Sequence, residues 1–145
     1  DYIDVGDVKA VTTVRTESRI FEMVDAVANR DGRRAFGLYY DLLALREPSM
    51  RILYLITNQI SRLITVCAMT NQGFSNKDIA AKAGCPEFAV RKYQAQGRTF
   101  SMEQLKAALR EGVSMEEAVK TGKIDDQLAV ELFIARCSGM KKSPA

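Results

Sequence analysis

Two pairs of neighbouring carboxylates, Glu116-Glu117 and Asp125-Asp126, could in principle perform acid–base chemistry in this chain. Paired carboxylates can share the roles of general acid and base when they face one pocket. The chain has no histidine, the side chain that most often transfers protons near neutral pH. Both pairs also stand where helices are predicted to begin, a place where the helix dipole favours negative charge. We therefore interpret them as helix-start residues and expect no catalytic residue.

The segment Lys120-Thr121-Gly122-Lys123 has residue types found in phosphate-binding loops. Such a loop needs a glycine-rich lead after a strand, so that several backbone N–H groups can surround the phosphate. Neither the glycines nor a strand pattern precedes Lys120. The segment therefore does not indicate a nucleotide site, and we expect no cofactor.

The three cysteines, Cys67, Cys85 and Cys137, lie far apart and form no C-x-x-C pair. An odd number of cysteines at these spacings fits neither a disulfide framework nor a zinc site. We interpret them as reduced core thiols of a cytoplasmic protein and expect no metal.

A stronger signal comes from residues 74–93, FSNKDIAAKAGCPEFAVRKY, which have the spacing of a helix-turn-helix unit. A small Ala80 would let two helices cross closely, Gly84 would take the left-handed turn, and Val90 would pack inward. If the second helix entered a DNA major groove, exposed residues on both helices would contact the bases or phosphates. These residues are Glu87, Arg91, Lys92 and Gln94 on the second helix, and Lys77 and Lys82 on the first.

The same spacing is also a common way to pack two short helices, and the acidic Glu87 would repel phosphate. A net charge of +3 is too small to indicate nucleic-acid binding by itself. Residues 75–96 therefore leave two interpretations open, a DNA-binding helix-turn-helix and a packing unit. A second small basic patch, formed by Arg30, Arg33 and Arg34, is interpreted as a solvated helix start.

The length and composition indicate one globular domain. A chain of 145 residues with 47% hydrophobic and 27% charged residues can bury a core without disulfides or metals. The first residue is Asp1 rather than methionine, from which we expect a piece of a larger protein. We expect no membrane span, because the longest apolar stretch, residues 52–69, is interrupted by Thr57, Asn58, Gln59, Ser61 and Arg62.

Apolar residues recur at helical spacing along nearly the whole chain, which predicts a compact all-α array of about seven helices. Predicted N-caps at Asp31, Ser75 and Ser101, the last with Gln104 in a capping box, and Pro48 in a first turn mark helix starts. Residues 2–15 are predicted to hold a short helix begun by Asp4 and then a β-branched run. Further on, Gly112 leaves one long helix or a break as alternatives.

Four stretches, taken in order, resemble the C-terminal region of the delta subunit of bacterial DNA polymerase III, the clamp-loader subunit. The resemblance covers most of residues 18–136. One departure is the segment before Lys120, where Gly112 and Ser114 interrupt a helix that the family usually continues, and Glu116 replaces an aspartate. The stretches are RIFEMVDAVANRDGRRAFGLYYDLL, EPSMRILYLITNQISRLITV, GFSNKDIAAKAGCPEFAVRKYQAQGRTFSMEQL and VKTGKIDDQLAVELFIAR.

This resemblance implies a domain organisation and a function. Residues 1–14 would end a preceding lid-type domain and its linker, residues 15–138 would form a helical collar domain, and residues 139–145 a frayed tail. The collar would oligomerise, without catalysis, with the tau or gamma and delta-prime subunits. The sliding clamp would be contacted through a missing N-terminal domain, and DNA only indirectly.

The resemblance also marks candidate interface residues. They are Arg51, Ile52, Lys120, Thr121, Gly122 and Glu131, to which we add the aromatic Tyr54 on the same broadly apolar helix. The alternative function, a helix-turn-helix DNA-binding domain, would instead use Lys77, Lys82, Arg91 and Lys92.

Overall fold

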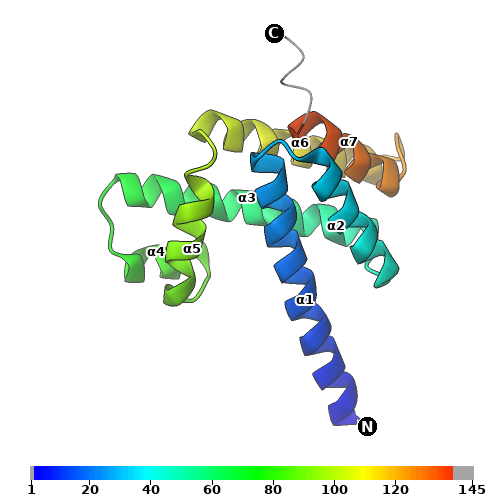
Figure 1. Ribbon diagram of the computed structural model, residues 1–145, viewed down its shortest axis with the longest axis horizontal. Helices are drawn as coiled ribbons and strands as arrows, with labels where there is room; N and C mark the ends of the chain where they lie inside the picture. The colour runs from blue at the N-terminus through cyan, green and yellow to red at the C-terminus, as the bar shows by residue number, and fades with distance from the viewer. Residues whose placement is uncertain (1, 139–145) are drawn as a thin grey trace.

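The computed structural model describes residues 2–138, with side chains from residue 15 onward, and these residues form seven α-helices and no strand. The all-α prediction is confirmed, as is the number of helices (Figure 1). The tail predicted for residues 139–145 lies outside the described residues. The helices are α1 (Tyr2–Ala28), α2 (Gly32–Ala44), α3 (Ser49–Asn71), α4 (Asn76–Ala83), α5 (Glu87–Gly97), α6 (Met102–Lys120) and α7 (Asp126–Ser138).

Helix α1 is a single helix of 27 residues that continues through the β-branched run, so the prediction of only a short helix begun by Asp4 within residues 2–15 is wrong. No proline interrupts the segment, and β-branched residues lower helix propensity only slightly. The N-terminal part of α1 extends away from the other helices (Figure 1). The helix passes through residue 14, and the proposed boundary there stays a prediction.

Helix α3 is the central element and packs against α1, α2, α4, α5, α6 and α7. Its side chains Ile52, Leu53, Ile56, Ile60 and Leu63 are almost completely buried. By length and composition alone α3 could cross a membrane. The polar residues within residues 52–69 therefore do not by themselves exclude a membrane span. A core helix of a folded domain has the same properties, and α3 occupies that position.

Helix α6 continues through Gly112, which settles the two alternatives left by the sequence. Gly112 is buried, and a methyl group added there would overlap Cγ2 of Thr57 on α3. One turn further along α6, Glu116 Oε2 accepts a hydrogen bond of 2.8 Å from Thr57 Oγ1. Gly112 therefore serves close packing of α6 on α3 rather than a break. Because α6 ends at Lys120, Glu116 and Glu117 lie near its C-terminus, and the interpretation of this pair as helix-start residues is wrong.

Most helix starts follow the predicted capping chemistry. The side chains of Asp31, Ser75 and Ser101 each accept a bond from a backbone N–H in the first turn, and Gln104 completes the capping box. Pro48 lies one residue earlier than predicted, at the N-cap of α3 instead of in its first turn. Its extended backbone there still leads directly into the helix, since proline needs no N–H partner.

Two arginines occupy left-handed backbone positions that glycine usually takes at helix ends. Arg30 follows α1 with φ 60°, and Arg46 follows α2 with φ 68°. In both turns the next N–H bonds back to the preceding helix, with Glu47 N–H 3.1 Å from the Leu42 carbonyl. The turn at Arg46 therefore fixes the position of Glu47 just before α3.

The close approach of α3 and α6 predicts that Gly112→Ala is destabilising. We expect the free energy of unfolding to fall by about 1–3 kcal/mol, the usual cost of overpacking, despite the better helix propensity of alanine. Urea unfolding followed by circular dichroism measures the change. Gly37→Ala on α2 is the matched control, because a methyl group at Gly37 meets no atom within 4 Å.

A second variant tests the cause. Thr57→Ser removes Cγ2 but keeps the hydroxyl that bonds Glu116, so Thr57→Ser combined with Gly112→Ala should recover part of the lost stability. Equal stability of Gly112→Ala and Gly37→Ala would show that the two helices do not approach closely.

Candidate functional site

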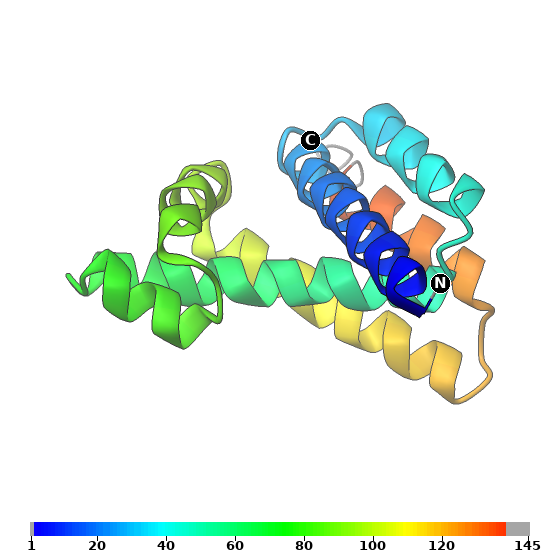
Figure 2. The same cartoon turned by 90° about the horizontal axis from the view of Figure 1, so that it is seen from below.

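The packing of α3 on α6 brings predicted interface residues from distant parts of the sequence to one end of the domain. The two helices run antiparallel, because Thr57 meets Gly112 while Cys67, further along α3, shares a cavity with Met102 and Leu105. The start of α3 therefore lies beside the end of α6, with α2 and α7 at the same end and α4 and α5 at the other (Figure 2).

We call this the α2/α7 end of the domain, formed by exposed or half-exposed residues of four helices and their adjoining turns. Of the predicted interface residues, only Ile52 is missing from it, because its side chain is 0% exposed and lies in the core. The assignment of Ile52 to the interface is corrected accordingly. The residues of the α2/α7 end are Tyr40, Leu45, Arg51, Tyr54, Lys120, Thr121, Gly122, Leu128 and Glu131.

Arg51 forms an ion pair with Glu47, which was not among the predicted site residues. Its Nε lies 3.2 Å from Glu47 Oε1, and the side chain of Glu47 is only 9% exposed, compared with 48% for Arg51. The other oxygen of Glu47 accepts a 2.6 Å hydrogen bond from Thr16 on α1. Glu47 therefore links α1 to α3, and Arg51 compensates its charge. The i, i+4 spacing of Glu47 and Arg51 was a signal available in the sequence.

Aromatic residues dominate the part of this end formed by α2. Tyr40 Oη donates a 3.3 Å hydrogen bond to Glu131 Oε2 on α7. The ring of Tyr40 is stacked on that of Phe36, with the two ring centroids 6.2 Å apart. Desolvation and the negative charge of Glu131 raise the pKa of Tyr40 above its usual value. A tyrosine hydroxyl is protonated at neutral pH even without this shift, so Tyr40 can donate to Glu131 and join α2 to α7.

The segment Lys120-Thr121-Gly122 forms the C-terminus of α6. Thr121 Oγ1 donates a 2.9 Å hydrogen bond to the Glu117 carbonyl, and Gly122 takes a left-handed conformation with φ 80°. The Lys123 N–H then bonds to the Ala118 carbonyl. These contacts give the segment a helix-stopping role, while Lys120 and Thr121 remain exposed.

At the opposite end, α4 and α5 pack as the helix-turn-helix pattern predicts. Ala80 and Val90 are buried together, and Gly84 adopts the left-handed turn with φ 75°. Lys77, Lys82, Arg91, Lys92 and Glu87 are exposed, as a contact surface would require. Gln94, by contrast, is only partly exposed.

The amide of Gln94 is directed toward α3 and α4 rather than toward solvent. Its Nε2 lies 2.9 Å from Thr70 Oγ1 and 3.3 Å from Asn76 Oδ1. The prediction that Gln94 would face DNA is therefore wrong, because its donors are used inside the domain.

Buried polar side chains fix α5 against α1 and α3. Gln59 Nε2 donates to Gln96 Oε1 at 3.0 Å, and Gln96 Nε2 donates to the Phe21 carbonyl at 3.0 Å. Arg62 on α3 reaches the carbonyl of Ala83 at the end of α4 at 3.4 Å. These bonds join four helices, so the α4–α5 unit is held as part of the domain.

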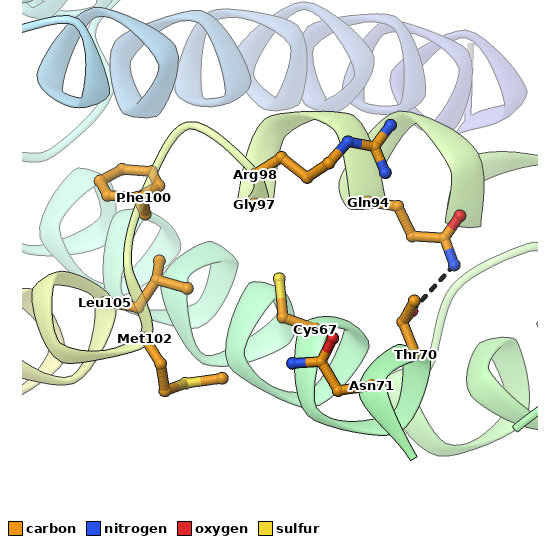
Figure 3. A pocket seen from close by; sticks show the side chains of 9 residues that line it. All are labelled: Cys67, Thr70, Asn71, Gln94, Gly97, Arg98, Phe100, Met102 and Leu105. Carbon is orange, nitrogen blue, oxygen red and sulfur yellow. Dashed lines mark hydrogen bonds between the residues drawn. The ribbon is translucent and has the colours of Figure 1, made fainter. Parts of the chain in front are cut away.

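A small cavity of about 280 Å³ lies between α3, α5 and α6 (Figure 3). The Cys67 thiol points into it, with Arg98 and Gln94 on the side formed by α5. Burial raises the pKa of the Cys67 thiol, and Arg98 partly offsets the effect. A thiol of this kind is a poor nucleophile at neutral pH. Among residues 15–138, no group of three or more histidine, cysteine or acidic side chains is placed to hold a metal.

Six helices packed around the central helix α3, with exposed aromatic side chains at both ends, describe an all-α domain whose candidate sites are surfaces. Residues 17–137 match the family described as "DNA polymerase III delta subunit, C-terminal domain". The chain belongs to this family, which confirms the resemblance found in the sequence.

One curated sequence and one solved structure, both of a delta protein from Bacillus subtilis, agree with this assignment. The DNA polymerase III subunit delta of Bacillus subtilis (strain 168) is 33% identical over 132 residues, or 91% of this chain. The solved structure of the Bacillus subtilis DNA clamp loader delta protein is similar with a TM-score of 0.78 and 33% identity over 84% of this chain. The chain spans 38% of the first relative and 36% of the second.

The Glu47 contacts predict that charge reversal at Arg51 destabilises the domain itself. Arg51→Glu would place a second carboxylate beside the mostly buried Glu47, so we expect it to lower the free energy of unfolding by about 1 kcal/mol more than Arg51→Gln. Urea unfolding checks this, with Lys106→Glu on the exposed face of α6 as a charge-matched control.

If Arg51→Glu and Arg51→Gln unfold at the same urea concentration, the pair with Glu47 contributes nothing to stability. If instead the predicted difference is found, Arg51→Gln becomes the better variant for any test of assembly, since it leaves the fold less disturbed.

Proposed function

We propose that this chain is the collar-type assembly module of a clamp-loader delta subunit. In this proposal the domain acts without catalysis in the cytoplasm and oligomerises with the tau or gamma and delta-prime subunits. The larger protein would contact the sliding clamp through its N-terminal part, so that the clamp can be opened and loaded on DNA. Family membership over residues 17–137 supports the clamp-loader context.

The main support for the assembly role is the exposure of apolar side chains at the α2/α7 end. Tyr40, Leu45, Tyr54 and Leu128 are each more than a third exposed, and Tyr54 reaches 56%. Protein interfaces are enriched in tyrosine, and a few such residues usually supply most of the binding free energy. Arg51 and Lys120 are exposed at the same end of the domain and can form a polar rim.

The same end has the rigidity that an interface needs. Glu47 ties α1 to the start of α3, and the Tyr40–Glu131 hydrogen bond ties α2 to α7. Side chains that are already ordered lose less conformational entropy on binding. This supports the α2/α7 end as the face that meets a neighbouring subunit.

The proposal predicts that truncating Tyr54 weakens assembly without unfolding the domain. Size-exclusion chromatography with light scattering, at micromolar concentrations of the chain and matching tau or gamma and delta-prime subunits, would detect the complex. We expect wild type to co-elute and Tyr54→Ser to bind at least about tenfold more weakly, as expected for a central interface tyrosine.

Phe88→Ser is the matched control, because it also removes an exposed aromatic ring but at the α4–α5 end. Loss of the complex with Phe88→Ser and not with Tyr54→Ser would overturn the choice of face. No complex with wild type would count against the assembly role of this domain.

A further inference from the structure

The cavity between α3, α5 and α6 has no role in the assembly proposal and lies away from the α2/α7 end (Figure 3). Its volume of about 280 Å³ is just below the range of about 300–1,000 Å³ that is typical of pockets enclosing a whole small molecule. The cavity therefore suits a single large side chain or another group of that size.

One side of the cavity is apolar. Leu105 is 1% exposed and belongs to the main core, against which Phe100 and Cys67 also pack. Figure 3 shows Phe100, Met102 and Leu105 gathered on the side formed by α6 and the turn before it. An apolar group that entered here would leave water and contact side chains from α3 and α6, which favours its binding.

The opposite side is polar and carries a positive charge. The side chains that stand there are Thr70, Asn71, Gln94 and Arg98 (Figure 3). The guanidinium of Arg98 forms no ion pair or side-chain hydrogen bond within residues 15–138. Among the described residues that line the cavity, none is aspartate or glutamate, so the charge of Arg98 is not balanced there. A ligand with an anionic group is therefore complementary to this side.

The walls of the cavity are in place before any ligand arrives. Gly97 lets α5 lie close to α3, since a methyl group added at Gly97 would overlap Cys67 Sγ. The neighbouring residue Gln96 accepts a hydrogen bond of 3.0 Å from Gln59 on α3. The backbone that carries Arg98 is thereby held against α3, and binding needs little reordering of the cavity walls.

We propose that this cavity binds the carboxy-terminal residue of a partner protein, with its apolar side chain beside Phe100 and Leu105 and its carboxylate on Arg98. At a chain end the side chain and the carboxylate share one α-carbon, so both fit a cavity the size of one side chain. A guanidinium can hold a carboxylate through two parallel hydrogen bonds. The partner would end in an apolar residue such as leucine, and its binding does not depend on the assembly role of the α2/α7 end.

Two other occupants fit the cavity less well. A free amino acid would bring an ammonium group, and the described lining offers no carboxylate to pair with it. A group attached covalently to Cys67 is disfavoured, because burial raises the pKa of this thiol. A peptide end brings no ammonium group to the cavity, and the exposed amide of Asn71 can hydrogen-bond its main chain.

Fluorescence anisotropy of the 145-residue chain with two labelled peptides tests the proposal. Both have the sequence Ser-Gly-Ser-Gly-Leu with the label at the amino end, and they differ in having a free carboxylate or an amide at the other end. We expect saturable binding of the acid and at least about tenfold weaker binding of the amide, because charge-assisted hydrogen bonds are lost. Arg98→Gln should remove that difference, whereas Arg110→Gln, at an exposed position of α6, should leave it unchanged.

Alkylation of cysteine locates the bound peptide. The Cys67 thiol points into the cavity, so the acetylated acid peptide at saturating concentration should slow its reaction with iodoacetamide at alkaline pH. Mass spectrometry of the digested chain measures the rate. Cys85, in the turn between α4 and α5, is the internal control and should react equally fast with and without the peptide.

Four results would overturn the proposal. In the first, the acid and the amide bind equally well, which indicates an apolar cavity without carboxylate recognition. In the second, neither peptide binds at concentrations up to about 1 mM. In the third, the acid binds but Cys67 is not protected, which places the peptide elsewhere. In the fourth, isocaproate, which has the leucine side chain and a carboxylate but no peptide chain, competes as well as the peptide, which identifies a small acid as the ligand.

Discussion

The contact between Thr57 and Gly112 is the constraint on which the arrangement of the domain depends. Only a residue without a side chain lets α6 lie this close to α3, and the Thr57–Glu116 hydrogen bond then fixes the register of the two helices. That register decides which residues share an end of the molecule. It places Lys120, at the end of α6, at the same end of the domain as Arg51 and Tyr54 near the start of α3, and leaves α4 and α5 at the far end.

Helix α3 also explains why polar residues interrupt the most apolar part of the sequence. Thr57 bonds to α6, Gln59 to α5, and Arg62 to the end of α4. A buried polar side chain is costly unless it finds a partner, so each of these residues specifies one neighbour in one position. No buried side-chain nitrogen or oxygen is left without a partner in the described part of the chain. The apolar residues supply the driving force for packing, and the polar ones select the arrangement.

Local chemistry made the helices predictable, whereas the surfaces depend on contacts between distant residues. The capping box at Ser101 and Gln104 and the turn at Gly84 involve neighbours in sequence, so their residue types were sufficient. Gly112 could not be interpreted in this way, because its reason is Thr57 on another helix. Ile52 and Gln94 were misplaced for the same reason, since the side of a helix that faces inward follows from its neighbours. The spacing of Glu47 and Arg51 was visible in the sequence, but the bond from Glu47 to Thr16, 31 residues away, was not.

Helix α1 is hydrogen-bonded to residues at both ends of the domain. At the α2/α7 end, Thr16 donates to Glu47, whose charge is balanced by Arg51. At the other end, the Phe21 carbonyl of α1 accepts from Gln96, which is bonded in turn to Gln59 on α3. The two attachments lie five residues apart on one rigid helix, so together they fix both its position and its direction. A subunit bound near Arg51 would therefore bear on the direction in which α1 leaves the domain.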